Sequence, residues 1–178
     1  MSQLGKHLGG HANITHLDEA SLKYIVDKYE IETAYDLGCG PGGMVSCMLD
    51  HGVQSTGIDG DFTLNLKIPH IIHDFETGPI EGLEKRDFCW SVEFLEHVYE
   101  KFMDNYFSVF KQVKYILCTA SQNPHAYHHV NVKPVSYWIE QFTSRGFKYS
   151  EDDSDYIRAN SSMSRDFIRE TGMVFINE

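Results

Sequence analysis

The sequence predicts an α/β fold in which helices cover both faces of a mainly parallel, seven-stranded sheet. Three observations predict it: short apolar segments alternate with amphipathic helical stripes, a glycine-rich segment follows the first of them, and acidic residues follow several others. The 178 residues suit one domain, and no repeat or linker divides them. We therefore expect a single domain over residues 1–178.

The predicted strands cover residues 33–37, 54–58, 70–73, 87–92, 114–119, 147–150 and 173–176. The first helix is expected after Asp18, a good N-cap, because Leu22, Ile25, Val26 and Tyr29 repeat with helical spacing. Apolar stripes predict further helices over residues 44–50, 102–113 and 135–142. The last two strands are expected to close the sheet as a hairpin.

Residues after the sixth strand are strongly acidic. Asp152, Asp153 and Asp155 form a charge cluster that predicts a solvated loop, since the following residues do not complete a calcium-binding motif. The four cysteines lack the paired spacing of zinc sites or disulfide frameworks, so buried free thiols are expected at Cys39, Cys47, Cys89 and Cys118.

The net charge and the hydropathy of the chain limit the kinds of partner that we expect it to bind. A formal charge of −11 argues against binding of long nucleic acid, which requires a basic surface. No apolar run approaches the roughly 20 residues that cross a bilayer, and the first residues lack the pattern of a signal peptide. We expect a cytoplasmic protein with no membrane partner, and the oligomeric state stays open.

The segment Asp36-Leu37-Gly38-Cys39-Gly40-Pro41-Gly42-Gly43 follows the first strand, and Asp59 ends the second. Gly38, Gly40 and Gly43 satisfy the dinucleotide pattern GxGxxG, so an NAD site is one interpretation. Asp36 favours a ligand with an ammonium group and would repel a pyrophosphate placed at the following helix. Asp59 can accept hydrogen bonds from ribose hydroxyls with either ligand.

This glycine segment, Asp59 and the Asp74-Phe75 pair after the third strand together resemble class I S-adenosylmethionine (SAM)-dependent methyltransferases, over about residues 33–176. The resemblance implies a Rossmann-like three-layer sandwich with SAM as cofactor. By it, Asp36, Gly38 and Gly40 border the methionine part, Asp59 holds the ribose, and Asp74 and Phe75 contact the adenine. The full implied set is Asp36, Gly38, Cys39, Gly40, Asp59, Gly60, Asp74, Phe75 and Val92.

An ExxEH pattern, Glu93, Glu96 and His97, follows the fourth strand. If this segment is helical, the three side chains share a face and suit a divalent cation. The pattern with a later histidine resembles the metal sites of Hen1-type small-RNA 2′-O-methyltransferases and of ubiquinone-synthesis O-methyltransferases. That resemblance implies Mg²⁺ or Mn²⁺ held by Glu93, Glu96, His97 and one of His128 or His129; His125 is a further candidate from the same loop.

Two other interpretations of this cluster stay open. The stretch can shape the pocket without metal, or His97 or His129 can act as a general base. We take Glu93, His97 and His129 as the candidate catalytic residues. Residues 1–18 are expected to cover the cofactor, with His11 or His16 touching SAM or substrate.

The sequence thus predicts SAM-dependent methyl transfer to an oxygen nucleophile of a small-molecule acceptor, assisted by a metal. The alternatives are a metal-dependent RNA 2′-O-methyltransferase and a non-catalytic SAM- or nucleotide-binding module. An NAD-dependent oxidoreductase is disfavoured by Asp36 and by the lack of an evident hydride-transfer constellation.

Overall fold

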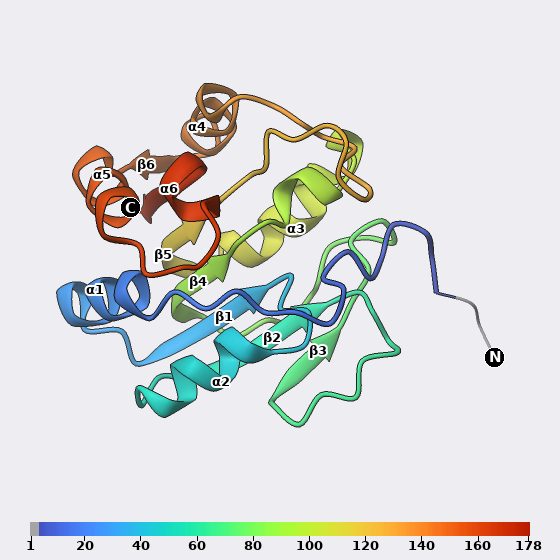
Figure 1. The fold of residues 1–178 in the computed structure, drawn as a ribbon, viewed down its shortest axis with the longest axis horizontal. Coiled ribbons are helices and arrows are strands. Elements are labelled where there is room, and N and C mark those ends of the chain that lie inside the picture. The colour runs from blue at the N-terminus through green and yellow to red at the C-terminus, as the bar shows by residue number, and fades with distance from the viewer. Residues whose placement is uncertain (1–3) are drawn as a thin grey trace.

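The computed structural model describes residues 4–178, in which helices lie on both faces of one seven-stranded sheet (Figure 1). The strands are β1 (Thr33–Leu37), β2 (Gln54–Asp59), β3 (His70–Ile72), β4 (Arg86–Ser91), β5 (Val113–Cys118), β6 (Phe147–Tyr149) and β7 (Met173–Asn177). The helices are α1 (Glu19–Tyr29), α2 (Gly43–Asp50), α3 (Met103–Phe110), α4 (Val135–Thr143), α5 (Glu151–Asn160) and α6 (Phe167–Thr171). Two short 3₁₀ turns, Leu95–His97 and Glu100–Phe102, follow β4.

The strand order is β3-β2-β1-β4-β5-β7-β6. The first five strands of this order pair in parallel, whereas β7 runs antiparallel to both β5 and β6. The order reverses direction between β1 and β4, which places a ligand crevice at the carboxyl ends of these strands. The predicted α/β class, the three layers and the mainly parallel sheet are confirmed.

Each face of the sheet buries its own apolar cluster. On one face, Tyr106 of α3 and Trp138 of α4 are fully buried with side chains of β1, β5 and β7. On the other, Leu22 of α1, Met48 of α2 and Ile168 of α6 are fully buried with side chains of β1, β4 and β7. No helix of the described chain is long and apolar enough to cross a membrane.

The prediction of a solvated loop around Asp152, Asp153 and Asp155 is wrong, because these residues begin helix α5. Carboxylates in a first turn are favoured by the helix dipole. Asp153 is buried and accepts hydrogen bonds from Tyr24, Tyr29 and Ser150, while Lys28 forms an ion pair with it. Helices α5 and α6 therefore separate β6 from β7, so these strands pair without forming a simple hairpin.

The prediction of buried free thiols is confirmed at three of the four cysteines. All four thiols are free; Cys39, Cys89 and Cys118 are buried, and Cys47 is partly exposed. Burial raises the pKa of the Cys39 thiol, so it stays protonated at neutral pH. These cysteines therefore act as small apolar side chains.

Candidate functional site

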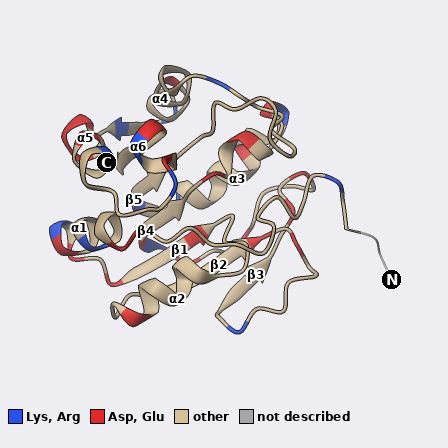
Figure 2. Ribbon diagram, viewed as in Figure 1, with Lys and Arg blue, Asp and Glu red and all other residues tan. Residues whose placement is uncertain are grey.

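A cavity of about 340 Å³ lies at the carboxyl ends of β1, β2 and β4. Its wall includes every residue that the resemblance assigned to the cofactor: Asp36, Gly38, Cys39, Gly40, Asp59, Gly60, Asp74, Phe75 and Val92. Figure 2 shows acidic positions near the carboxyl ends of β1 and β2, at this side of the sheet. The residues are brought together as expected, while their role as cofactor ligands stays a prediction.

The loop between β1 and α2 turns through left-handed backbone at Gly38 (φ 78°) and Gly40 (φ 49°). A side chain at Gly38 would approach Phe94 within 2.7 Å, so the position needs glycine for space as well as for conformation. Asp59 fixes the loop, because its Oδ2 accepts a hydrogen bond of 2.8 Å from the Gly40 backbone nitrogen. Asp59 thus links the end of β2 to the glycine loop.

Asp36 projects into the cavity from β1 and is 3% exposed. Burial, and then the negative charge of Asp59, raise its pKa to about 8. A carboxyl group without a cationic partner in such a place favours its protonated form. A bound ammonium group would reverse that preference, which makes Asp36 suited to the amino group of an amino-acid ligand.

Asp74 and Phe75 follow β3 at the other end of the cavity. Phe75 is buried edge-on to Phe94 and His73. Asp74 Oδ2 lies 2.8 Å from Nε2 of His7, and its Oδ1 accepts a hydrogen bond from the backbone of Glu76. An aromatic wall beside a carboxylate suits a flat base that carries an amino group.

The N-terminal segment, residues 4–18, runs along the cavity, while residues 1–3 of the predicted cover lie outside the described part. Besides the His7 contact, His11 Nε2 lies 3.1 Å from Asp61 Oδ2, and Thr15 Oγ1 accepts a hydrogen bond from the Gly43 nitrogen. Tyr127, from the loop after β5, donates to the carbonyl of Lys6. In Figure 1 this segment crosses the sheet near the ends of β1 and β2.

Glu93 departs from the predicted ExxEH face. Its backbone is left-handed (φ 56°), and the 3₁₀ turn begins only at Leu95, so the expected helical face does not form. Burial raises the pKa of Glu96, and the Glu93 carboxyl still lies close enough to Glu96 for its charge to raise that pKa further. Thr119 Oγ1 instead donates to Glu93 Oε1 at 3.0 Å. Burial raises the pKa of Glu93, which makes its carboxylate a stronger base than an exposed one.

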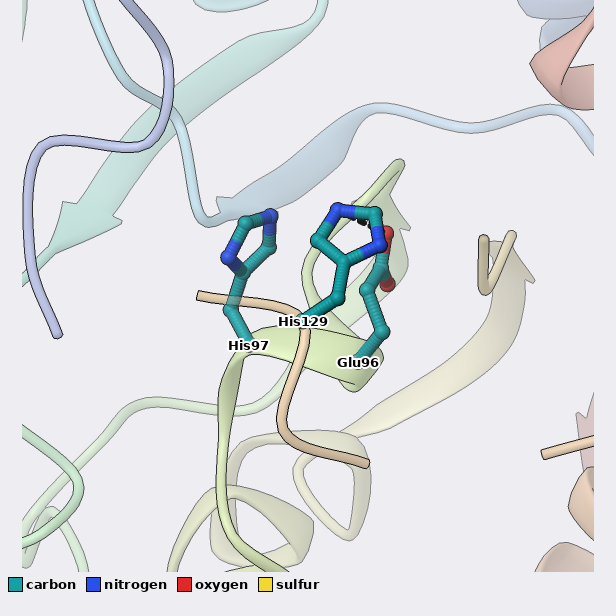
Figure 3. A group of neighbouring side chains, drawn as sticks. All are labelled: Glu96, His97 and His129. Atoms are coloured by element: carbon teal, nitrogen blue, oxygen red, sulfur yellow. Dashed lines mark ion pairs between the residues drawn. The ribbon is translucent and has the colours of Figure 1, made fainter. Parts of the chain in front are cut away.

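Glu96, His97 and His129 form a compact cluster in which one potential ligand atom from each lies within 4.8 Å of the others. Figure 3 shows Glu96 and His97 on the short turn after β4, with His129 approaching from the loop after β5. The β4 and β5 strands are neighbours, so their following loops meet at this edge. The imidazole rings of His97 and His129 are 4.7 Å apart and nearly perpendicular.

The chemistry of this cluster fits a divalent metal. Glu96 is fully buried, and neither of its carboxylate oxygens has a hydrogen-bond partner among the described residues. The Asn123 carbonyl lies 2.7 Å from His129 Nδ1, so that nitrogen carries the proton and Nε2 is free. Burial and the neighbouring His129 lower the pKa of His97 to about 4, which keeps it a neutral ligand.

His128 and His125 lie outside this group of three. His128 packs against the rings of Tyr99 and His7, and His125 is exposed. His128 has left-handed backbone (φ 49°), so consecutive histidines diverge at this turn. Of the two histidines left open by the sequence, His129 is the one that joins Glu96 and His97.

Several cavity residues were not expected from the sequence: His7, His73, Ser121, Asn123, Arg165 and Phe167. Most belong to loops, whose place in the cavity depends on tertiary packing and leaves no local pattern. Arg165 and Phe167 come from the region between β6 and β7, where a helical insertion had not been predicted.

No protein-family model and no curated protein matches this chain. Solved structures of similar fold include the methyltransferase domain of bacterial CtHen1, at 13% identity over 89% of this chain and 96% of that chain, with a TM-score of 0.62. The plantazolicin methyltransferase BpumL, in complex with S-adenosylhomocysteine (SAH), is 13% identical over 90% of this chain and 82% of that chain, with a TM-score of 0.59. Magnesium protoporphyrin IX methyltransferase from Synechocystis, with bound SAM, is 12% identical over 90% and 79%, with a TM-score of 0.54. These similarities show that the chain has the fold of class I SAM-dependent methyltransferases.

Proposed function

We propose that this chain, which has the class I methyltransferase fold, transfers the methyl group of SAM to an oxygen nucleophile of a small-molecule acceptor with the help of a divalent metal. One observation carries the proposal: a single cavity joins the glycine loop with Asp36 and Asp59 to His97 and His129 of the polar cluster. Donor and acceptor sites that share one cavity can align the two reactants and exclude water.

In this proposal the cofactor lies along the glycine loop. Asp36 binds the ammonium group, and Gly38 and Gly40 let the methionine part approach the backbone. Cys39 and Gly60 complete that wall, because the cavity reaches both. Asp59 accepts hydrogen bonds from the ribose hydroxyls, while Asp74, Phe75 and Val92 surround the adenine.

Glu96, His97 and His129 would hold the metal, which we take to be Mg²⁺ or Mn²⁺. When bound, it would act as a Lewis acid that lowers the pKa of the acceptor hydroxyl. Neutral imidazoles satisfy the requirement that ligands be deprotonated, and Glu96 would lose, on metal binding, the proton that burial favours. Glu93, His125 and His128, the other candidate ligands from the sequence, stay outside this set.

Glu93 accepts the proton of the acceptor hydroxyl in this mechanism. Thr119 holds Oε1, and the Glu93 side chain lines the cavity in which the acceptor would bind. As the proton moves to Glu93, the acceptor oxygen forms a bond to the methyl carbon and the carbon–sulfur bond of SAM breaks. The bonding electrons stay on sulfur, and SAH leaves as the neutral thioether.

Metal assistance is tested by mutation of the cluster. Activity of the wild type should fall after EDTA treatment and return with Mn²⁺, whereas Glu96→Gln combined with His97→Ala should abolish both effects. Full, EDTA-insensitive turnover by that double variant would eliminate the metal. A Glu93→Gln variant separates the two roles, since it should lose turnover while retaining Mn²⁺ binding.

RNA is the second candidate substrate, favoured by the similarity to the CtHen1 domain and by the Glu96-His97-His129 cluster. The charge of −11 weighs against it. Incubation with SAM and a short RNA separates the candidates, because methylation of a terminal 2′-hydroxyl would make RNA the acceptor. If the protein binds SAH but methylates neither small molecules nor RNA, a non-catalytic binding module becomes the better account.

A further inference from the structure

Arg165 lies on the loop between α5 and α6 and reaches the wall of the cavity. It is the single lysine or arginine among the described lining residues, whereas five carboxylates line the same cavity: Asp36, Asp59, Asp74, Glu76 and Glu93. Arg145, Arg158 and Arg169 each form an ion pair within residues 4–178, whereas the exposed Arg165 and also Arg86 form none there. An unpaired cation is therefore directed to an otherwise acidic cavity.

One aromatic ring lies beside the Arg165 guanidinium, and a second packs against that ring. It lies 5.3 Å from the centroid of the Phe167 ring, and the His16 ring meets Phe167 edge-on at 5.4 Å. Burial, and then the charge of Arg165, lower the pKa of His16, so His16 is neutral at pH 7 and can donate through a ring N–H. Stacking on an aromatic ring orients a guanidinium without using its hydrogen-bond donors.

The loop that carries Arg165 is fixed at both ends. Asp18, the N-cap of α1, accepts hydrogen bonds from the backbone and hydroxyl of Ser162 at 3.1 Å each. Arg169 of α6 donates to the carbonyls of Met163 and Arg165. The backbone of Arg165 is thus held next to the N-terminal segment.

Arg165, His16 and Phe167 form a corner that borders both halves of the cavity, the donor half at the glycine loop and the acceptor half near the polar cluster. On one side, Thr15 precedes His16 and bonds the Gly43 nitrogen at the glycine loop. On the other side, Thr171 of α6 accepts a hydrogen bond from the Ala120 nitrogen, next to the cavity residue Ser121. A group bound by Arg165 can accordingly belong to a ligand in the donor half or in the acceptor half.

We propose that Arg165, together with His16 and Phe167, forms a carboxylate-binding corner of this cavity. The planar guanidinium fork matches a carboxylate, and a single cation balances a single negative charge. This inference rests on the proposed function for the identity of the ligands. The carboxylate comes either from the amino-acid part of the cofactor or from the acceptor.

Calorimetry distinguishes the two sources. We would titrate wild type, Arg165→Gln and a control variant, Lys148→Gln on the exposed part of β6, with three probes. The probes are SAH, 5′-methylthioadenosine, which lacks the amino-acid part, and benzoate, which is added with and without saturating SAH. If the carboxylate is that of the cofactor, Arg165→Gln weakens SAH binding by about 10-fold or more and leaves methylthioadenosine unchanged.

If the carboxylate belongs to the acceptor, Arg165→Gln leaves SAH binding unchanged and abolishes the binding of benzoate seen with wild type. The inference is overturned if Arg165→Gln binds both SAH and benzoate as tightly as wild type does. It is also overturned if wild type binds no benzoate and Arg165→Gln leaves the affinity for SAH unchanged. A third contradicting result is an Arg165→Gln variant whose affinity for methylthioadenosine falls as much as its affinity for SAH. If the wild type bound neither SAH nor methylthioadenosine, the proposed function would be overturned instead. The benzoate titration without SAH would still test the carboxylate-binding corner.

Discussion

His129 Nε2 lies 3.9 Å from Oε1 of Glu96, although the two residues come from loops after different strands. Both atoms are free of hydrogen bonds in the described chain: Glu96 has no partner, and the Asn123 carbonyl holds the opposite ring nitrogen of His129. Burial and the charge of Glu93 raise the pKa of Glu96 well above its usual range. A cation between these atoms would compensate a carboxylate that the fold otherwise leaves unpaired.

Loss of a cluster residue should therefore weaken metal binding. We expect Glu96→Gln and His129→Ala each to raise the dissociation constant for Mn²⁺ at least about 10-fold, measured from the loss of the free Mn²⁺ electron paramagnetic resonance signal. His128→Ala serves as the matched comparison, because its ring faces Tyr99 and His7. Equal losses in the two histidine variants would contradict the assignment of His129.

Binding of SAH should release a proton at pH 7. The pKa of Asp36 is about 8 in the structure, so the carboxyl group is mainly protonated at pH 7, and a bound ammonium group would lower that pKa. Because binding releases a proton, the affinity for SAH should rise as pH increases from about 6 to about 8. Calorimetry in buffers of different ionisation enthalpy should detect the released proton. Asp36→Asn should abolish that release, and an unchanged buffer dependence in this variant would exclude Asp36 as the source.

The contacts of His7 and His11 should slow exchange of the cofactor. Both pair with acidic residues beside the cavity, at 2.8 Å and 3.1 Å. Each partly buried contact is expected to contribute about 1 kcal/mol, so His7→Gln with His11→Gln should speed SAH dissociation by roughly 10-fold or more. Stopped-flow fluorescence measures this rate. His70→Gln, at an exposed position of β3, is the control, and an unchanged rate in the double variant would show that the N-terminal segment does not gate the cavity.

Asp153 should contribute more to stability than its neighbour Asp152. The buried Asp153 side chain contacts Lys28, Tyr24, Tyr29 and Ser150, whereas Asp152 is exposed. Asp153→Asn should lower the free energy of unfolding by about 2 kcal/mol at pH 7, and Asp152→Asn by less than about 0.5 kcal/mol. Urea denaturation measures both values.

The contribution of Asp153 to the free energy of unfolding should decrease as pH falls. Burial alone would raise the pKa of Asp153, but hydrogen bonds led by Lys28 outweigh it and lower the pKa to about 2. A depressed native pKa adds stability above the unfolded value near 4, and that stability is lost as pH falls towards 2. The difference in free energy of unfolding between wild type and Asp153→Asn should therefore become smaller from about pH 4 to about pH 2. A constant difference would contradict the ion-pair network.

The sequence predicted those features that depend on residues close to one another along the chain. The alternation of strands and helices, the loop from Asp36 to Gly43 and the acidic residue Asp59 could be recognised because each has a fixed spacing along the chain. Helix α5 was missed because Asp152, Asp153 and Asp155 look like an exposed acidic cluster in the sequence. Asp153 is in fact buried against Tyr24 and Tyr29 of α1, which are distant along the chain.

The polar cluster was predicted only in part. Glu96 and His97 are adjacent in sequence, but the choice of His129 over His128 depends on the turn at His128 and on the Asn123 carbonyl. Glu93, whose backbone is left-handed, does not belong to the group of three ligand atoms, although its charge acts on Glu96. Arg165 enters the cavity through an insertion between β6 and β7, and no residue pattern reports that placement.

The most direct test of the central claim is a calorimetric titration of the EDTA-treated protein with SAH, repeated with NAD and with the Asp59→Ala variant. The account predicts that wild type binds SAH and not NAD, and that Asp59→Ala loses at least about 10-fold in SAH affinity while remaining folded by circular dichroism. Binding of NAD by a folded wild-type sample that does not bind SAH would contradict the account and make a dehydrogenase the better interpretation.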